Sequence, residues 1–135
     1  MPATLEDIAL RTHMNLPYEQ ALERVATALQ AEGFGVLTEI DVQATLKKKL
    51  NVDFRRYAIL GACNAPVAHQ ALTTELEIGL LLPCSVIVYE DDTGTVVSIL
   101  DPQVLVTLSG NTVLQPLMAD AHARLARVIA ALTPA

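Results

Sequence analysis

The sequence lacks the short motifs of the common nucleotide-dependent and hydrolytic enzymes. It contains no phosphate loop of the form G-x-x-x-x-G-K, no dinucleotide motif G-x-G-x-x-G, no nucleophile turn G-x-S-x-G and no metal motif H-E-x-x-H. Gly33 and Gly35 flank the start of a predicted strand and do not form a phosphate cradle. These enzyme classes therefore lose most of their support.

Basic residues, long apolar runs and cysteines are also few. Nine Lys and Arg against 15 Asp and Glu give a net charge of −6, so we expect neither a nucleic-acid nor a membrane partner. The longest apolar run, 78–89, is interrupted by glycine, proline and serine and is shorter than the roughly 20 residues that cross a bilayer. Glu6 and Asp7 stand where a secretory signal would be positively charged, which predicts a cytoplasmic protein. In that reducing compartment Cys63 and Cys84 are expected to be free thiols.

The residues that are present suit one globular domain. The chain has 135 residues, 52% of them hydrophobic and 18% charged, which predicts a single domain over residues 1–135. Apolar periodicity predicts strands at 7–14, 34–41, 55–63, 84–90 and 95–100, long helices at 18–32 and 113–132, and short helical segments at 42–50, 65–72 and 102–110.

This order of elements predicts an α+β fold with one antiparallel hairpin around residues 91–94. Two amphipathic helices can cover only one sheet face, so either solvent or a second subunit covers the other. Alternation in the strand at 34–41 predicts that one set of side chains faces the helices: Phe34, Val36, Thr38 and Ile40.

The two cysteines are the first candidates for chemistry. Cys63 ends a predicted strand just before a helix, and a helix N-terminus stabilises a thiolate. Cys84 begins the next strand, so the two sulfurs approach each other if these strands are neighbours. The alternative is that each cysteine is a small buried apolar residue. A zinc or copper site made of both cysteines and His69 has suitable ligand types but no supporting spacing.

Charged residues supply a second group of candidates. Glu39 and Asp41 project from the same side of a strand and could act as an acid and base or bind a cation. Their alternative roles are a solvated strand end and a helix cap. Lys47, with the two lysines after it, could receive an anion, although consecutive helical residues point in different directions.

Three stretches, 33–41, 57–64 and 78–84, together with 88–90 and 101–102, resemble the family of proteins called domain of unknown function 302 over residues 8–132. The resemblance implies a curved, mostly antiparallel sheet backed by helices, similar to the TATA-binding-protein-like fold group, and often a dimer. It carries no established activity. The family's motif positions fall here on Glu39, Asp41, Lys47, Cys63, Asn64, Cys84 and Asp101, which we therefore expect to line any functional site.

Three functions remain open at this point. The first is a non-enzymatic homodimeric module that binds a small ligand, a metal or a thiol-reactive species, with Cys63 and Cys84 at the edge of its site. The second is a redox or sulfur-handling enzyme with Cys63 as nucleophile and Cys84 as resolving thiol. The third is an oligomerisation module with inert thiols. The sequence assigns no cofactor, and we favour a protein that is not an enzyme.

Overall fold

Five antiparallel strands form one sheet in the computed structural model, which describes residues 4–134. The ends of the predicted domain, residues 1–3 and 135, lie outside the described part. The sheet order is β1-β5-β4-β3-β2. The strands are β1 (Ala9–Met14), β2 (Gly35–Asp41), β3 (Tyr57–Cys63), β4 (Cys84–Asp91) and β5 (Gly94–Leu100). The predicted hairpin is β4 and β5, and the α+β fold is confirmed.

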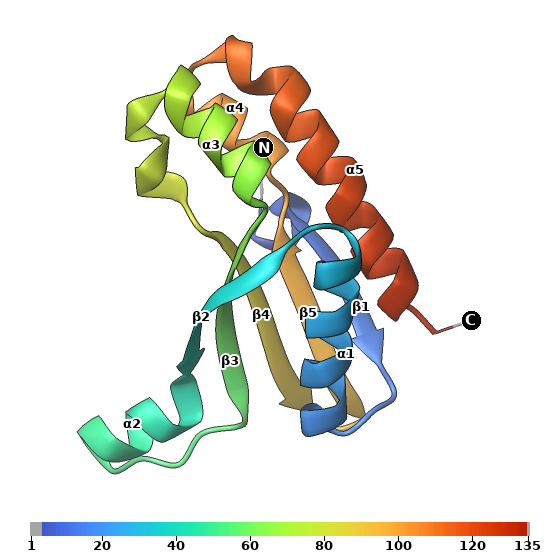
Figure 1. Cartoon of the computed structure of the whole chain (residues 1–135). Helices are drawn as coiled ribbons and strands as arrows, with labels where there is room; N and C mark the ends of the chain where they lie inside the picture. Colours follow the sequence, from blue (N-terminus) through green and yellow to red (C-terminus); the bar gives the residue numbers. More distant parts are fainter. Residues whose placement is uncertain (1–3, 135) are drawn as a thin grey trace.

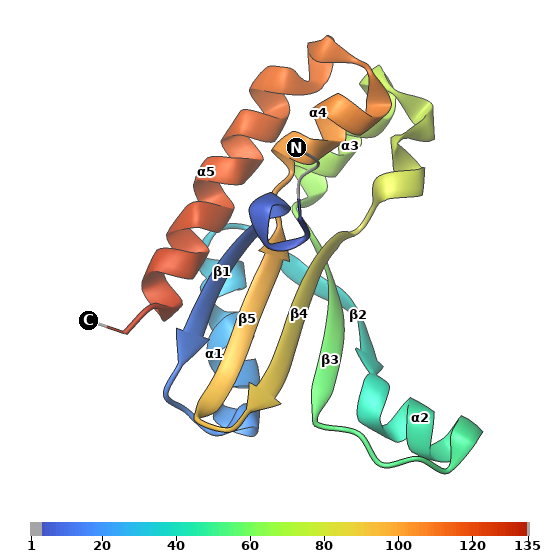
Figure 2. The same ribbon diagram turned by 180° about the vertical axis from the view of Figure 1, so that it is seen from behind.

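Two long helices cover one face of this sheet, as predicted. They are α1 (Tyr18–Ala31) and α5 (Gln115–Leu132), which lie side by side in Figure 1. Val25 and Leu29 of α1 and Leu125 of α5 are buried against the central strands. The opposite face has no helix over it (Figure 2). On that face the rings of Tyr57 and Tyr89 stack with centroids 5.3 Å apart.

A second core lies beyond the end of the sheet. It is built from α3 (Ala65–Thr74), the 3-10 helices η2 (Leu76–Leu81) and η3 (Thr112–Leu114), α4 (Gln103–Ser109) and the start of α5, around buried Ile78, Leu105 and Met118. The sequence pattern predicts no element where η2 lies, since a short 3-10 turn has no long apolar period of its own.

The prediction for the face of β2 was wrong in its second half. A β-bulge between Val36 and Thr38 pairs Val36 with Ala62 but Thr38 with Gly61, so one extra residue reverses the alternation. Thr38 and Ile40 therefore lie on the uncovered face. Glu39 takes the helix side, where the sequence had placed Ile40.

The segment that starts with β2 stands away from the rest of the molecule. β2 is an edge strand exposed along its whole length, and the following helix α2 (Val42–Leu50) buries no residue. Figures 1 and 2 show α2 at the C-terminal end of β2, far from α1 and α5. We call residues 35–54 the β2–α2 arm. It leaves large apolar side chains exposed, among them Ile40, Leu50 and Phe54.

Within residues 4–134 the fold contains no helix with the length and apolar character that a bilayer crossing requires.

Candidate functional site

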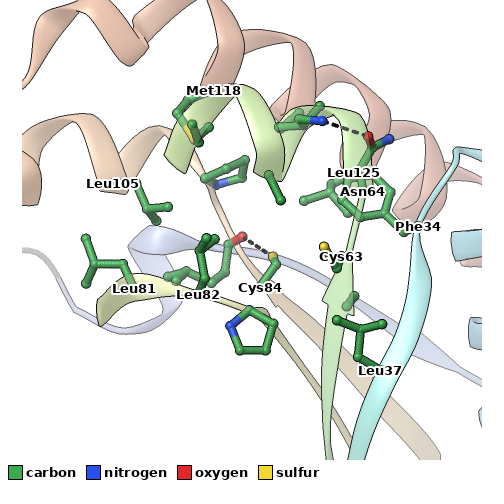
Figure 3. A pocket seen from close by; sticks show the side chains of 18 of the residues that line it. Phe34, Leu37, Cys63, Asn64, Leu81, Leu82, Cys84, Leu105, Met118 and Leu125 are labelled. Atoms are coloured by element: carbon green, nitrogen blue, oxygen red, sulfur yellow. Dashed lines mark hydrogen bonds between the residues drawn. The ribbon is translucent and has the colours of Figure 1, made fainter. Parts of the chain in front are cut away.

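A cavity of about 400 Å³ separates the two cores (Figure 3). Its sheet side is formed by the end of β3 and the start of β4, through Ala62, Cys63 and Cys84. Helices α3 and α5, with η2 and α4, close the other sides. Successive strand residues normally point to opposite faces. Both Ala62 and Cys63 nevertheless line the cavity, because it extends around the end of β3.

The lining is almost entirely hydrocarbon and sulfur. Among the described residues it contains no charged side chain, and its polar side chains other than the two thiols are Thr38 and Asn64. Several positions that face the space carry small residues, such as Ala68, Ala71 and Ala121. Protein interiors are normally packed to the density of organic crystals, with few voids larger than a water molecule. Small side chains at these positions keep open a space that larger ones would fill.

Cys84 is a half-buried thiol that keeps its proton at neutral pH. Burial raises its pKa to about 12, with smaller contributions from nearby Asp101 and Cys63. Its Sγ donates a weak hydrogen bond to the carbonyl oxygen of Leu100, at 3.7 Å. This interaction requires the thiol form. At neutral pH Cys84 is therefore a small apolar wall residue and a poor nucleophile.

Cys63 and Asn64 occupy the junction between β3 and α3, as the sequence predicts. Asn64 is buried, and its Oδ1 accepts a hydrogen bond from the backbone N–H of Val67 at 3.2 Å, which makes Asn64 the N-cap of α3. Cys63 is a free thiol, half-buried, immediately before this cap. The structure thus brings Cys63, Asn64 and Cys84 to one cavity.

The charged candidates of the arm lie elsewhere. Asp41 caps α2 by accepting a hydrogen bond from the N–H of Ala44 at 2.9 Å. Lys47 pairs with Asp53 across an exposed 3.2 Å contact. Neither residue lines the cavity, and Glu39 is solvent-exposed beside Asp41. Asp41 is therefore a helix cap, and Glu39 and Lys47 lie on a solvated surface.

Asp101 and His69 also have other surroundings. Asp101 contacts Nδ1 of His122 at 3.0 Å and accepts from the N–H of Gln103, so it links the start of α4 to α5. His69 is exposed on α3 and does not line the cavity. Across the described residues no three His, Cys, Asp or Glu side chains come together in a way that could hold a metal ion. The described residues therefore give no support to the three-ligand site, because His69 is exposed on α3 and lies outside the cavity that both cysteines line.

Most of the cavity wall was missed by sequence reasoning. Val67, Leu81, Leu105 and Met118 come from four separate elements, and each fits the apolar pattern of an ordinary core residue. The one available signal is the run of alanines on α3 and α5 at positions where a helix normally packs larger side chains.

A one-domain α+β protein with an apolar, thiol-containing cavity at the end of its sheet is thus the class that the fold and the site define. The family model described as domain of unknown function DUF302 matches residues 10–132, and the chain belongs to this family. The crystal structure of an uncharacterized conserved DUF302 protein from Bacillus stearothermophilus is similar to this chain, with 29% sequence identity over 93% of this chain and 98% of that one and a TM-score of 0.85. The comparison with curated proteins gives no match.

Proposed function

We propose that this protein is a non-enzymatic, cytoplasmic module that binds a small apolar molecule in the cavity between its two cores. The observation that carries the proposal is the cavity itself, whose volume of about 400 Å³ falls within the roughly 300–1,000 Å³ of small-molecule sites. A lining without charged groups favours an uncharged ligand, since an isolated charge is costly to transfer from water into such surroundings.

The cysteines fit this proposal better than they fit a redox enzyme. A resolving thiol attacks as the thiolate, and the raised pKa of Cys84 keeps that form scarce near neutral pH. Cys63 remains a thiol at the cavity wall that a bound molecule would cover. Its modification rate is therefore a reporter of occupancy.

A pair of variants on α3 tests the proposal with aminoanthracene, a fluorescent apolar probe. Ala68 lines the cavity, whereas Ala65 lies on the same helix, is exposed and does not line it. We expect the probe to bind the wild-type protein and the Ala65→Leu variant equally, and to lose at least tenfold in affinity for Ala68→Leu. Equal binding to all three proteins would place the probe elsewhere and contradict the proposal.

We also propose that the module is a homodimer in which a second copy covers the β2–α2 arm from Ile40 onward and the adjoining uncovered sheet face, and leaves Leu37 free. Two features of the arm support this proposal. It exposes several apolar side chains to solvent, and its strand β2 has no partner strand along its outer edge. The arm carries three lysines and three acidic residues and so has no net charge within a chain of net charge −6, so a contact between two arms does not bring two acidic surfaces together.

Light scattering at high micromolar concentration tests the dimer. Ile40 of the arm is 50% exposed, and Leu108 of α4, 64% exposed, supplies a control away from the arm. We expect the wild type and Leu108→Glu to be dimers and Ile40→Glu to be a monomer. A monomeric wild type would refute the proposal.

A further inference from the structure

We infer that the ligand of the cavity is a flexible hydrocarbon chain that ends in an uncharged polar group, such as an aliphatic alcohol or ester. This inference rests on the proposed function and specifies the ligand. Three features of the cavity carry it: the flexibility of its walls, the neutral character of its few polar groups and the apolar surface at its opening.

The walls suit an alkyl chain more than a flat ring. Leu81, Leu82, Leu105 and Met118 dominate the helical side, and these unbranched or γ-branched side chains adapt to the path of a chain. Among the described residues, Phe34 is the only aromatic one in the lining. A flat ring such as that of aminoanthracene can enter through apolar contacts, but it finds no pair of aromatic faces to stack between.

The polar side chains of the lining determine which end group the ligand can carry. Thr38 and Asn64 are the polar lining residues besides the thiols, and their hydroxyl and amide are both neutral. None of the described lining residues is a Lys, Arg or His that could balance a carboxylate or a phosphate. An ionised end would therefore be desolvated without a partner, whereas a hydroxyl or ester end would not carry that penalty.

Apolar surface continues outward from the cavity. Leu37 lines the cavity and is also 67% exposed, so it stands at the opening. Leu80 is 82% exposed and lies between Gly79 and Leu81, two further lining residues. A hydrocarbon chain that enters beside Leu37 passes from this exposed leucine to the buried Leu125, and none of the described lining residues on the way is charged.

Titration calorimetry with octanol, decanol and decanoate tests this inference. Each buried methylene should tighten binding about fourfold, so decanol should bind about 15-fold more tightly than octanol. Decanoate at neutral pH should bind at least tenfold more weakly than decanol. The affinity for decanol should fall at least tenfold in Ala68→Leu and stay unchanged in Ala65→Leu. Decanoate binding as well as decanol, or an affinity independent of chain length, would overturn the inference.

The outcomes separate this inference from the proposed function. If aminoanthracene binds in a way that depends on Ala68 but decanol does not bind, the proposed apolar site is supported and the chain-shaped ligand is refuted. Failure of both probes would refute both proposals. If Ala68→Leu does not fold by circular dichroism, protection of Cys63 from alkylation in the wild-type protein replaces it. Decanol should then slow the modification of Cys63 at least tenfold, and an unchanged rate would overturn the inference.

Discussion

The half-buried thiol of Cys84 predicts a specific loss of stability in alkali. Its pKa is about 12 in the folded protein, against an ordinary value of 9.0, because burial disfavours the thiolate. The unfolded chain therefore releases this proton at a lower pH than the folded chain does. The stability that the neutral thiol contributes is complete below about pH 9 and is lost as the pH rises from there through about 12.

The size of this loss follows from proton linkage. Between the two pKa values, each pH unit lowers the free energy of unfolding by about 1.4 kcal/mol. At about pH 10.5 the contribution of Cys84 is thus a loss of about 2 kcal/mol relative to about pH 8. Other groups also titrate over the same pH range, but their contribution is the same in the wild type and in a variant that changes only Cys84, so it cancels in the comparison.

Urea unfolding under reducing conditions, at about pH 8 and about pH 10.5 and at one protein concentration, measures the effect. The comparison is with Cys84→Ala, whose change in packing acts equally at both pH values. We expect the wild type to lose about 2 kcal/mol more than the variant between the two conditions. Equal losses would show that the thiolate of Cys84 is not disfavoured by burial, and the account of the cavity wall would be wrong.

Three further substitutions test the local structure around the site. Gly61→Ala should lower the free energy of unfolding by about 1–3 kcal/mol, because a Cβ there would lie 2.3 Å from Oγ1 of Thr38, whereas Gly35→Ala meets no atom within 4 Å and should change it far less in the same urea titration. Asn64→Ala removes the cap of α3 and should cost about 1 kcal/mol by thermal unfolding, with Asn64→Ser recovering most of it. Asp41→Ala should reduce helix content by circular dichroism, because it removes the cap of α2 while leaving the cavity intact.

Each of these predictions has a clear contrary result. If Gly61→Ala is as stable as Gly35→Ala, the pairing of Thr38 with Gly61 is looser than the structure has it. If Asn64→Ser is no better than Asn64→Ala, the hydroxyl does not replace the amide oxygen as the cap. Loss of probe binding in Asp41→Ala would mean that the arm and the cavity are coupled.

The sequence alone predicted the five strands, the α-helices and several of their ends. Asp41 caps α2, and β3 ends at Cys63 just before α3. These features depend on a few neighbouring residues, so local chemistry specifies them. The coverage of only one sheet face also followed from counting the amphipathic helices.

The tertiary structure decided where chemistry is possible. One extra residue in β2 reversed the side on which Thr38 and Ile40 lie, and no pattern in a single strand reveals a bulge that depends on the partner strand. The antiparallel pairing of β3 with β4 placed the start of β4 beside Ala62, and so brought Cys84 to the cavity that Cys63 lines. The volume between the two cores depends on how distant helices pack, and the sequence records their apolar faces but not the gap between them.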